Sequence, residues 1–470
     1  MRESEPIGSS GTGKKAKANK FIFITLGLCV NLTPVYLLFT INMKIINRLS
    51  FLLCVFLLGH GSVYSQTLAD VKMGEILNSG DLFQIRGQYP ILKDSLSMEM
   101  LNLVSEAQLG IGFNKLERAG SALDSLLQFH QTELGAETSV GMAALRAMNL
   151  LNLGLYSQAG KAGEDLVNAL KDVLPFESLY SFVFIERVGK ALSNCAGSYL
   201  ERPLHDITVP MKCDTVGRGF HFYIPVEVNG ITKDYIFDTG CSFGNFVSEE
   251  YAEEVGLKII SDSIPVSGMD VGFVKLAVAD SLKVGEIVYH NPIFMVAPPD
   301  EDLDSVFTFD GVLGYHFIRD VGEVIIDNES GAFVFPYQIS DGAPNMFLSS
   351  NTPIVRIEYE GKPFDMVFDT GNVKSNLGNE FAQMFPEALS GLPEHESRFG
   401  GFGGVSKTKA VTLPEFCFSL SGQPVTLHDT EVWMESSGSQ LFYSSLGADF
   451  VLAFKRLIIN YKNMFVRGEL

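Results

Sequence analysis

The chain has 470 residues, 46% of them apolar and 19% charged, which is typical of a folded protein with more than one domain. Its formal net charge of −20 argues against a nucleic-acid partner, because phosphate binding needs clustered Lys and Arg. The cysteines form no Cys-x-x-Cys pair and the histidines no His-Glu-x-x-His motif, so neither a metal centre nor an organic cofactor is predicted.

The N-terminus carries two apolar runs in succession. Residues 21–41 are long enough to span a membrane, whereas residues 43–65 have a basic start, a short apolar middle and small residues at the end. We interpret 43–65 as a secretory signal, with translation starting at Met43 and residues 1–42 as an upstream extension. The alternative is a membrane anchor at 21–41, which is less favoured because a second export segment would be redundant. N-terminal sequencing of the exported protein, expected to begin near Gln66, tests this interpretation.

Residues 66–200 are predicted to be helical. Apolar side chains recur at the spacing of one helix face, at Ala144, Met148, Leu151 and Leu155. A weak internal repeat, with an offset of about 43 residues, resembles two tetratricopeptide units. An ordinary helical bundle packed on the next domain explains the pattern equally well. We expect this region to be dispensable for chemistry, and it is the candidate surface for a protein partner.

The chain beyond residue 200 consists of two copies of one plan. Short runs rich in Val, Ile, Phe and Tyr alternate with turn residues, which is typical of strands. The copies span residues 201–340 and 345–470, and an offset of about 131 residues superposes them. In each copy an apolar run precedes an Asp-Thr-Gly triplet, and a Leu-Gly pair follows later. These elements are Asp238-Thr239-Gly240 with Leu313-Gly314, and Asp369-Thr370-Gly371 with Leu446-Gly447.

This duplicated pattern resembles the aspartic proteases, and most closely their retropepsin-like branch. The resemblance implies an α+β fold, in which the helical domain is followed by two mostly antiparallel β lobes with the substrate bound between them. It implies that Asp238 and Asp369 are the catalytic pair. Two neighbouring carboxyl groups cannot both ionise comfortably, so they share one proton and can act as acid and base together.

The other triplet residues have supporting roles. The glycines, Gly240 and Gly371, allow backbone to approach a carboxylate closely. By family analogy, the hydroxyls of Thr239 and Thr370 reach across to the opposite lobe. The family usually has Ser, Thr or Ala after the triplet, and this chain has Cys241 and Asn372 instead. Ser445 also replaces an apolar residue before the second Leu-Gly pair.

Glycine-rich hairpin tips are the candidates for flaps over the substrate. In the first lobe these residues are Gly268, Met269 and Asp270, and in the second lobe they are Gly401, Phe402 and Gly403. Surface hairpins without ligand contact are an equally good interpretation of either tip.

The sequence thus predicts an aspartic endopeptidase that cleaves peptide or protein substrates with water. One chain is expected to make one site, as a monomer. The family suggests a bacterial periplasmic or secreted setting. Two rivals remain: a non-catalytic peptide-binding protein on the same fold, and a scaffold whose helices bind a partner. The complete triplets in both lobes favour the enzyme.

Overall fold

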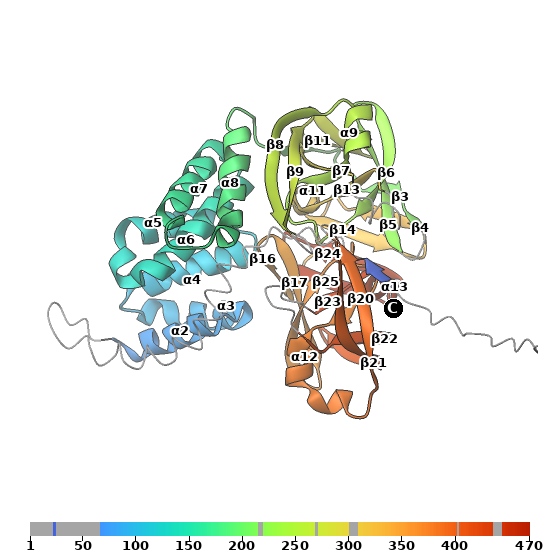
Figure 1. The fold of residues 1–470 in the computed structure, drawn as a ribbon. Helices are drawn as coiled ribbons and strands as arrows, with labels where there is room; N and C mark the ends of the chain where they lie inside the picture. Colours follow the sequence, from blue (N-terminus) through green and yellow to red (C-terminus); the bar gives the residue numbers. More distant parts are fainter. Residues whose placement is uncertain are drawn as a thin grey trace, which may run out of the picture.

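The computed structural model describes residues 22–24, 66–214, 220–267, 271–299, 309–401, 404–435 and 444–470. Helices lie on one side of the molecule, and two β lobes lie beside them (Figure 1). The predicted α+β class, with a helical region followed by two β lobes, is confirmed. No helix within these ranges is long and apolar enough to cross a membrane. The signal segment at 43–65 lies outside the described residues, as does all but three residues of the alternative anchor, so both interpretations stay predictions.

The helical region begins with a well-capped helix. The hydroxyl of Thr67 accepts a hydrogen bond from the backbone N–H of Asp70, whose carboxylate in turn accepts from the N–H of Thr67. This reciprocal capping box satisfies two backbone donors that a helix start leaves unpaired. The helices of this region are α2 (Leu68–Ser79), α3 (Leu82–Leu92), α4 (Glu99–Gly112), α5 (Leu116–Phe129), α6 (Gln131–Asn152), α7 (Tyr156–Leu170) and α8 (Tyr180–Ala191), with 3-10 turns at Lys93–Ser95 and Phe176–Leu179.

Consecutive helices pack against each other, and α7 and α8 approach most closely through glycine. A Cβ atom on Gly163 would lie 2.5 Å from the backbone nitrogen of Glu186 in α8. Only glycine allows two helix backbones to come this near.

The first lobe is built on an 11-stranded sheet. Along the sheet its strands are β2 (Tyr199–Glu201), β11 (Ile287–His290), β10 (Ser281–Val284), β5 (His221–Val228), β6 (Ile231–Phe237), β13 (Gly311–Leu313), β7 (Asn245–Ser248), β12 (Ile293–Ala297), β9 (Val271–Val278) and β8 (Lys258–Ser267), with β4 (Lys212–Asp214) paired to β5. Two short helices complete the lobe, α9 (Glu249–Glu254) and α11 (Tyr315–Val321).

The second lobe repeats this plan on a nine-stranded sheet. Its strands in order are β1 (Ile22–Ile24), β20 (Glu394–Gly401), β21 (Gly404–Leu420), β22 (Gln423–Trp433), β19 (Asn376–Leu377), β23 (Ser445–Leu446), β18 (Lys362–Phe368), β17 (Thr352–Tyr359) and β16 (Met346–Ser349). Its helices are α12 (Asn379–Met384) and α13 (Ala448–Leu452), with a 3-10 turn at Pro386–Leu389.

A third, five-stranded sheet joins the two lobes. Its strands are β25 (Phe465–Glu469), β24 (Arg456–Asn460), β14 (Glu323–Asp327), β15 (Ala332–Phe335) and β3 (Ile207–Pro210). The junction is the antiparallel pair β14–β24, in which Glu323 lies opposite Asn460 and Asp327 opposite Arg456. Each lobe therefore contributes strands to a shared sheet, which limits their relative movement.

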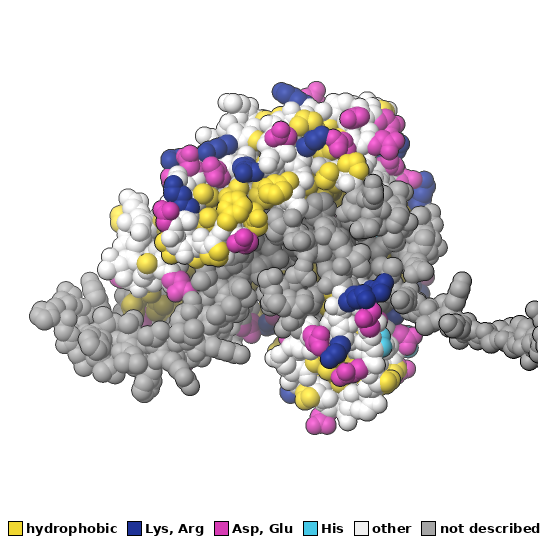
Figure 2. All heavy atoms as spheres, viewed as in Figure 1, with side chains coloured by type: hydrophobic (Ala, Val, Ile, Leu, Met, Phe, Trp, Pro, Cys, Tyr) yellow, Lys and Arg dark blue, Asp and Glu magenta, His cyan; other side chains and the backbone are white. Residues whose placement is uncertain are grey.

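The surface carries charges of both signs. On the described part of the face drawn in Figure 2, Lys and Arg side chains are interspersed with Asp and Glu, and apolar side chains lie between them.

Candidate active site

Equivalent strands deliver the two aspartates. Strand β6 ends at Phe237, directly before Asp238, and β18 ends at Phe368, directly before Asp369. The Leu-Gly strands, β13 and β23, pair in parallel with β6 and β18. The backbone N–H of Asp238 donates to the carbonyl of Leu313 at 3.1 Å, and that of Asp369 donates to Leu446 at 3.0 Å. The Leu-Gly elements seen in the sequence therefore hold the backbone of each aspartate.

The triplet glycines leave room for the opposite carboxyl group. A Cβ atom on Gly240 would lie 2.4 Å from Oδ1 of Asp369, and one on Gly371 would lie 2.5 Å from Oδ2 of Asp238. No other residue fits at either position, since real Cβ atoms do not approach so closely. The two loops thus face each other across the lobe boundary, and each carboxyl group lies against the other's glycine.

The triplet threonines form a reciprocal cross between the lobes. The hydroxyl of Thr239 donates to the carbonyl of Phe368 at 2.7 Å and accepts from the N–H of Thr370 at 3.1 Å. The hydroxyl of Thr370 donates to the carbonyl of Phe237 at 2.7 Å and accepts from the N–H of Thr239 at 3.0 Å. All four bonds are buried, so they fix the separation of the two loops.

The two carboxyl groups accept equivalent backbone hydrogen bonds. Oδ1 of Asp238 accepts from the N–H groups of Gly240 and Cys241 at 2.7 and 3.1 Å, and Oδ1 of Asp369 accepts from Gly371 and Asn372 at 2.9 and 3.2 Å. Burial raises the pKa of both aspartates, and the charge of Asp369 raises the pKa of Asp238 further. The hydrogen bond from Asp238 counteracts the rise in the pKa of Asp369.

Because the pKa of both aspartates is raised and they lie together, the pair holds one proton in common. Oδ2 of Asp238 receives no hydrogen bond from a described backbone or side-chain donor, so it is free to face Asp369. An acid beside a carboxylate is the combination that general acid–base chemistry needs.

A second set of residues, not expected from the sequence, holds the loops after the triplets. Nδ1 of His316 accepts from the N–H of Gly244 at 3.2 Å in the first lobe. In the second lobe Oδ1 of Asp449 accepts from the N–H of Ser375 at 2.7 Å. Both side chains follow the glycine of their Leu-Gly pair by two residues, so they occupy equivalent places. The sequence signal that could have found them is the alignment of the two copies, in which His316 stands opposite Asp449.

His221 contributes an interlobe contact that the sequence also did not reveal. This residue is the first of β5, and its Nε2 lies 3.1 Å from the carbonyl of Gly371 in the opposite loop. Because a carbonyl can only accept, Nε2 carries the hydrogen. Burial lowers the pKa of His221 to about 4, which keeps the ring neutral above that pH.

The strands on either side of each flap candidate are paired with each other. Strands β8 and β9 pair up to Ser267 and Val271, and β20 and β21 pair up to Gly401 and Gly404. Gly401 is the last residue of β20. The other candidates, Gly268, Met269, Asp270, Phe402 and Gly403, lie outside the described residues, so their contact with substrate stays a prediction.

Two cavities, of about 320 and 550 Å³, lie between the helices and the first lobe. Tyr156 lines both, and the larger one also reaches Arg319 and Lys462. Neither is lined by Asp238 or Asp369. We place the chemistry at the carboxyl pair, because there two buried carboxyl groups face each other across the lobe boundary.

Residues 224–317 match the model of the aspartyl protease family. The first lobe is thus similar in sequence to aspartyl proteases. The matched segment contains Asp238, Thr239, Gly240 and the Leu313-Gly314 pair. The second lobe lies outside the matched segment, but it repeats the same strands, triplet and Leu-Gly element.

Among solved structures, a retropepsin-like aspartic protease from Rickettsia conorii is 20% identical over 29% of this chain and 92% of its own, with a TM-score of 0.20. Conglutin gamma, a basic 7S globulin from lupine seeds, is 10% identical over 56% of this chain and 94% of its own, with a TM-score of 0.33. Basic 7S globulin from soybean is 10% identical over 56% and 96%, with a TM-score of 0.34. A search of curated proteins finds no match.

Proposed function

We propose that the protein is an aspartic endopeptidase that hydrolyses peptide bonds with a water held between Asp238 and Asp369. The observation that carries the proposal is the buried carboxyl pair, in which each group lies against the other loop's glycine. If each Asp-Thr-Gly triplet only formed a turn, there would be no reason for two copies to bring their carboxyl groups together.

The proposed reaction uses each aspartate in turn. Asp369 takes a proton from water while the water oxygen bonds to the peptide carbonyl carbon, and Asp238 gives its proton to the carbonyl oxygen. The product is a tetrahedral diol. Asp369 then gives its proton to the nitrogen, the C–N bond breaks, and one diol hydroxyl returns a proton to Asp238. The pair ends in its starting protonation state, with a carboxylic acid and an amine released.

The residues that depart from the family pattern leave this pair complete. Cys241 and Asn372 both donate a backbone N–H to an aspartate, a contact that does not depend on the side chain. The alternative, a peptide-binding protein without activity, would be favoured by the loss of a catalytic group, and both aspartates with their backbone donors are present.

Incubation of the purified chain with a peptide library at several pH values tests the proposal, with and without a statine-type inhibitor. Inhibitor-sensitive cleavage by wild type, absent from Asp369→Asn, supports the enzyme. Binding of the inhibitor without any cleavage would instead favour the binding protein.

A further inference from the structure

The helices share a hydrophobic core with the catalytic face of the first lobe. Phe184 of α8 packs edge-on against Phe243, with ring centroids 5.2 Å apart, and Phe243 belongs to the loop that follows Asp238. The same core contains Ile264 and Val266 of β8, the strand that leads to the first flap candidate. Figure 1 shows α8 directly beside β8. Removal of the helices would expose this face, which argues against the expectation that they are dispensable for chemistry.

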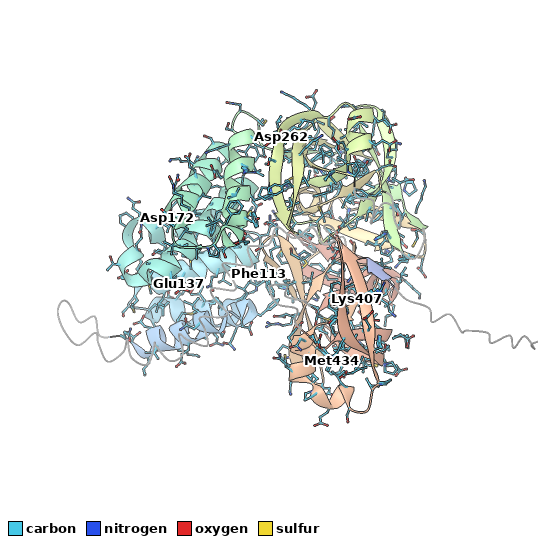
Figure 3. All side chains as sticks on the ribbon, viewed as in Figure 1. Phe113, Glu137, Asp172, Asp262, Lys407 and Met434 are labelled. Atoms are coloured by element: carbon cyan, nitrogen blue, oxygen red, sulfur yellow. The ribbon has the colours of Figure 1, made fainter. Side chains whose placement is uncertain are left out.

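The helices also contact the second lobe. Arg356 of β17 forms an ion pair with Asp81, the N-cap of α3, at 2.9 Å, and its guanidinium lies 4.5 Å from the ring of Phe83. Phe83 packs against Phe347 of β16, with ring centroids 5.7 Å apart. Phe113, labelled in Figure 3 where the helices meet the second lobe, packs edge-on against the same Phe83 ring. The helical region therefore bridges both lobes.

Buried hydrogen bonds between two side-chain amides, called the relay below, connect the helical region, the second lobe and the loop that follows Asp238. Nδ2 of Asn152, the last residue of α6, donates to Oδ1 of Asn351 at 2.7 Å. Nδ2 of Asn351 donates in return to Oδ1 of Asn152 at 3.0 Å, and also to the carbonyl of Ser242 at 3.1 Å. Ser242 is four residues after Asp238 and is fully buried.

Chemistry fixes the direction of each bond in this relay. The Ser242 carbonyl can only accept, so Asn351 must present its NH₂ group there, and its oxygen must then face the NH₂ of Asn152. Asn351 also occupies the hairpin turn between β16 and β17 with φ of 67°, a conformation that asparagine tolerates better than most residues. An aspartate would keep the turn and lose both donors.

We propose that Asn351 is a positioning residue for the Asp238 loop, and that the helical region holds it in place through Asn152. This role rests on the proposed peptidase function. The relay is one-sided, because the internal alignment places Phe220 opposite Asn351, and a phenylalanine side chain can neither donate nor accept. In the second lobe Asp449 accepts from the N–H and hydroxyl of Ser375, and the contact of that loop with the other lobe is made by His221 rather than by the helices. The helices thus support the loop that follows Asp238.

The test compares relay variants with matched controls in the full chain. Asn351→Gly keeps the positive φ and removes the amide, and Asn152→Ala removes its partner. Asn149→Ala deletes another buried amide of α6, which bonds to Leu116 inside the helical region. Ser350→Gly alters the same turn, at φ of 51°, outside the relay. Two readouts are measured: kcat and KM on a peptide that wild type cleaves, and amide hydrogen exchange of residues 239–244.

The relay variants are expected to lower kcat by about 10- to 100-fold, with KM within about twofold, because a displaced carboxyl group impairs the reaction more than binding. Exchange of the 239–244 amides should also accelerate in both. Asn149→Ala and Ser350→Gly should match wild type in both readouts. Equal effects of relay and control variants, or no effect of the relay variants, would overturn the positioning role.

Failure of the peptidase proposal would look different. If wild type cleaves no peptide, the proposed function fails, and the exchange measurement alone decides whether the relay holds the loop. Faster exchange in Asn351→Gly than in Ser350→Gly supports the hold, and equal exchange refutes it.

Discussion

The side-chain amide of Asn372 donates to the hydroxyl of Ser445 at 3.3 Å, and also to Oδ1 of Asn376 at 3.0 Å. Asn372 and Ser445, the two residues of the second lobe that depart from the family pattern, are therefore hydrogen-bonded to each other. An apolar residue at position 445 would leave the buried Asn372 with one acceptor fewer. The pair explains why the second lobe tolerates a serine where the first lobe has Val312.

Ser445→Val and Asn372→Ala are expected to be coupled. Each single variant should lower the free energy of unfolding by about 1–2 kcal/mol, since it leaves a buried polar group short of a partner. The double variant should cost less than the sum, by about 0.5–1 kcal/mol. Denaturant unfolding of the four proteins measures the coupling. Combining Ser445→Val with Cys241→Ser in the other lobe should give additive losses, and coupling of similar size there would contradict the interpretation.

The threonine cross should contribute strongly to stability. Thr239→Val leaves the carbonyl of Phe368 and the N–H of Thr370 buried without this partner, so we expect a loss of about 2–5 kcal/mol. Thr239→Ser keeps the hydroxyl and should cost only about 1 kcal/mol. Urea unfolding at constant pH compares them. A serine variant as unstable as the valine variant would show that the methyl group, rather than the cross, matters.

The carboxyl pair should make the fold less stable as pH rises. The pKa of Asp238 is raised in the folded state, so its stabilising contribution is complete below the unfolded pKa of 3.8 and is lost as pH rises toward the folded pKa. Asp238→Asn has no such group to ionise. The melting temperature of this variant, minus that of wild type, should therefore grow from pH 4 to pH 7. The expected scale is about 2–4 °C for each kcal/mol. A difference that is constant or shrinks with pH would contradict the raised pKa.

His221 should act in the opposite direction. Its folded-state pKa is lowered from 6.5 to about 4, so stability is complete above about pH 6.5 and is lost as pH falls toward 4. The loss should amount to roughly 3 kcal/mol. His221→Gln can still donate to the carbonyl of Gly371 but does not titrate in this range. Unfolding at pH 4, 5.5 and 7 should show a flatter profile for the variant, and parallel profiles would rule out the histidine as the cause.

The duplicated sequence reveals the architecture of the site because its motifs are local. An Asp-Thr-Gly triplet after an apolar strand and a later Leu-Gly pair each need only a few neighbouring residues to be recognised. The facing glycines and the threonine cross follow once two such units meet.

The contacts that the sequence did not reveal join residues far apart along the chain. Asn152 and Asn351 are separated by 199 positions, and His221 and Gly371 by 150. A lone asparagine at a helix end or in a turn has an adequate local explanation, so nothing in its neighbourhood indicates a distant partner. The five-stranded sheet was not predicted for the same reason. Strands β14 and β24 are far apart along the chain, and nothing in either segment indicates that they pair.

The most direct test of the central claim is the activity of Asp238→Asn, Asp369→Asn and the double variant, measured with wild type over a range of protein concentrations. Each single variant should fold and lose cleavage by at least about 10³-fold, with the double variant no worse, since residues that act as a unit are not additive. Wild-type specific activity should be independent of concentration, because one chain holds both aspartates. A folded single variant with near-normal activity, or wild type active only at concentrations where it dimerises, would contradict the account.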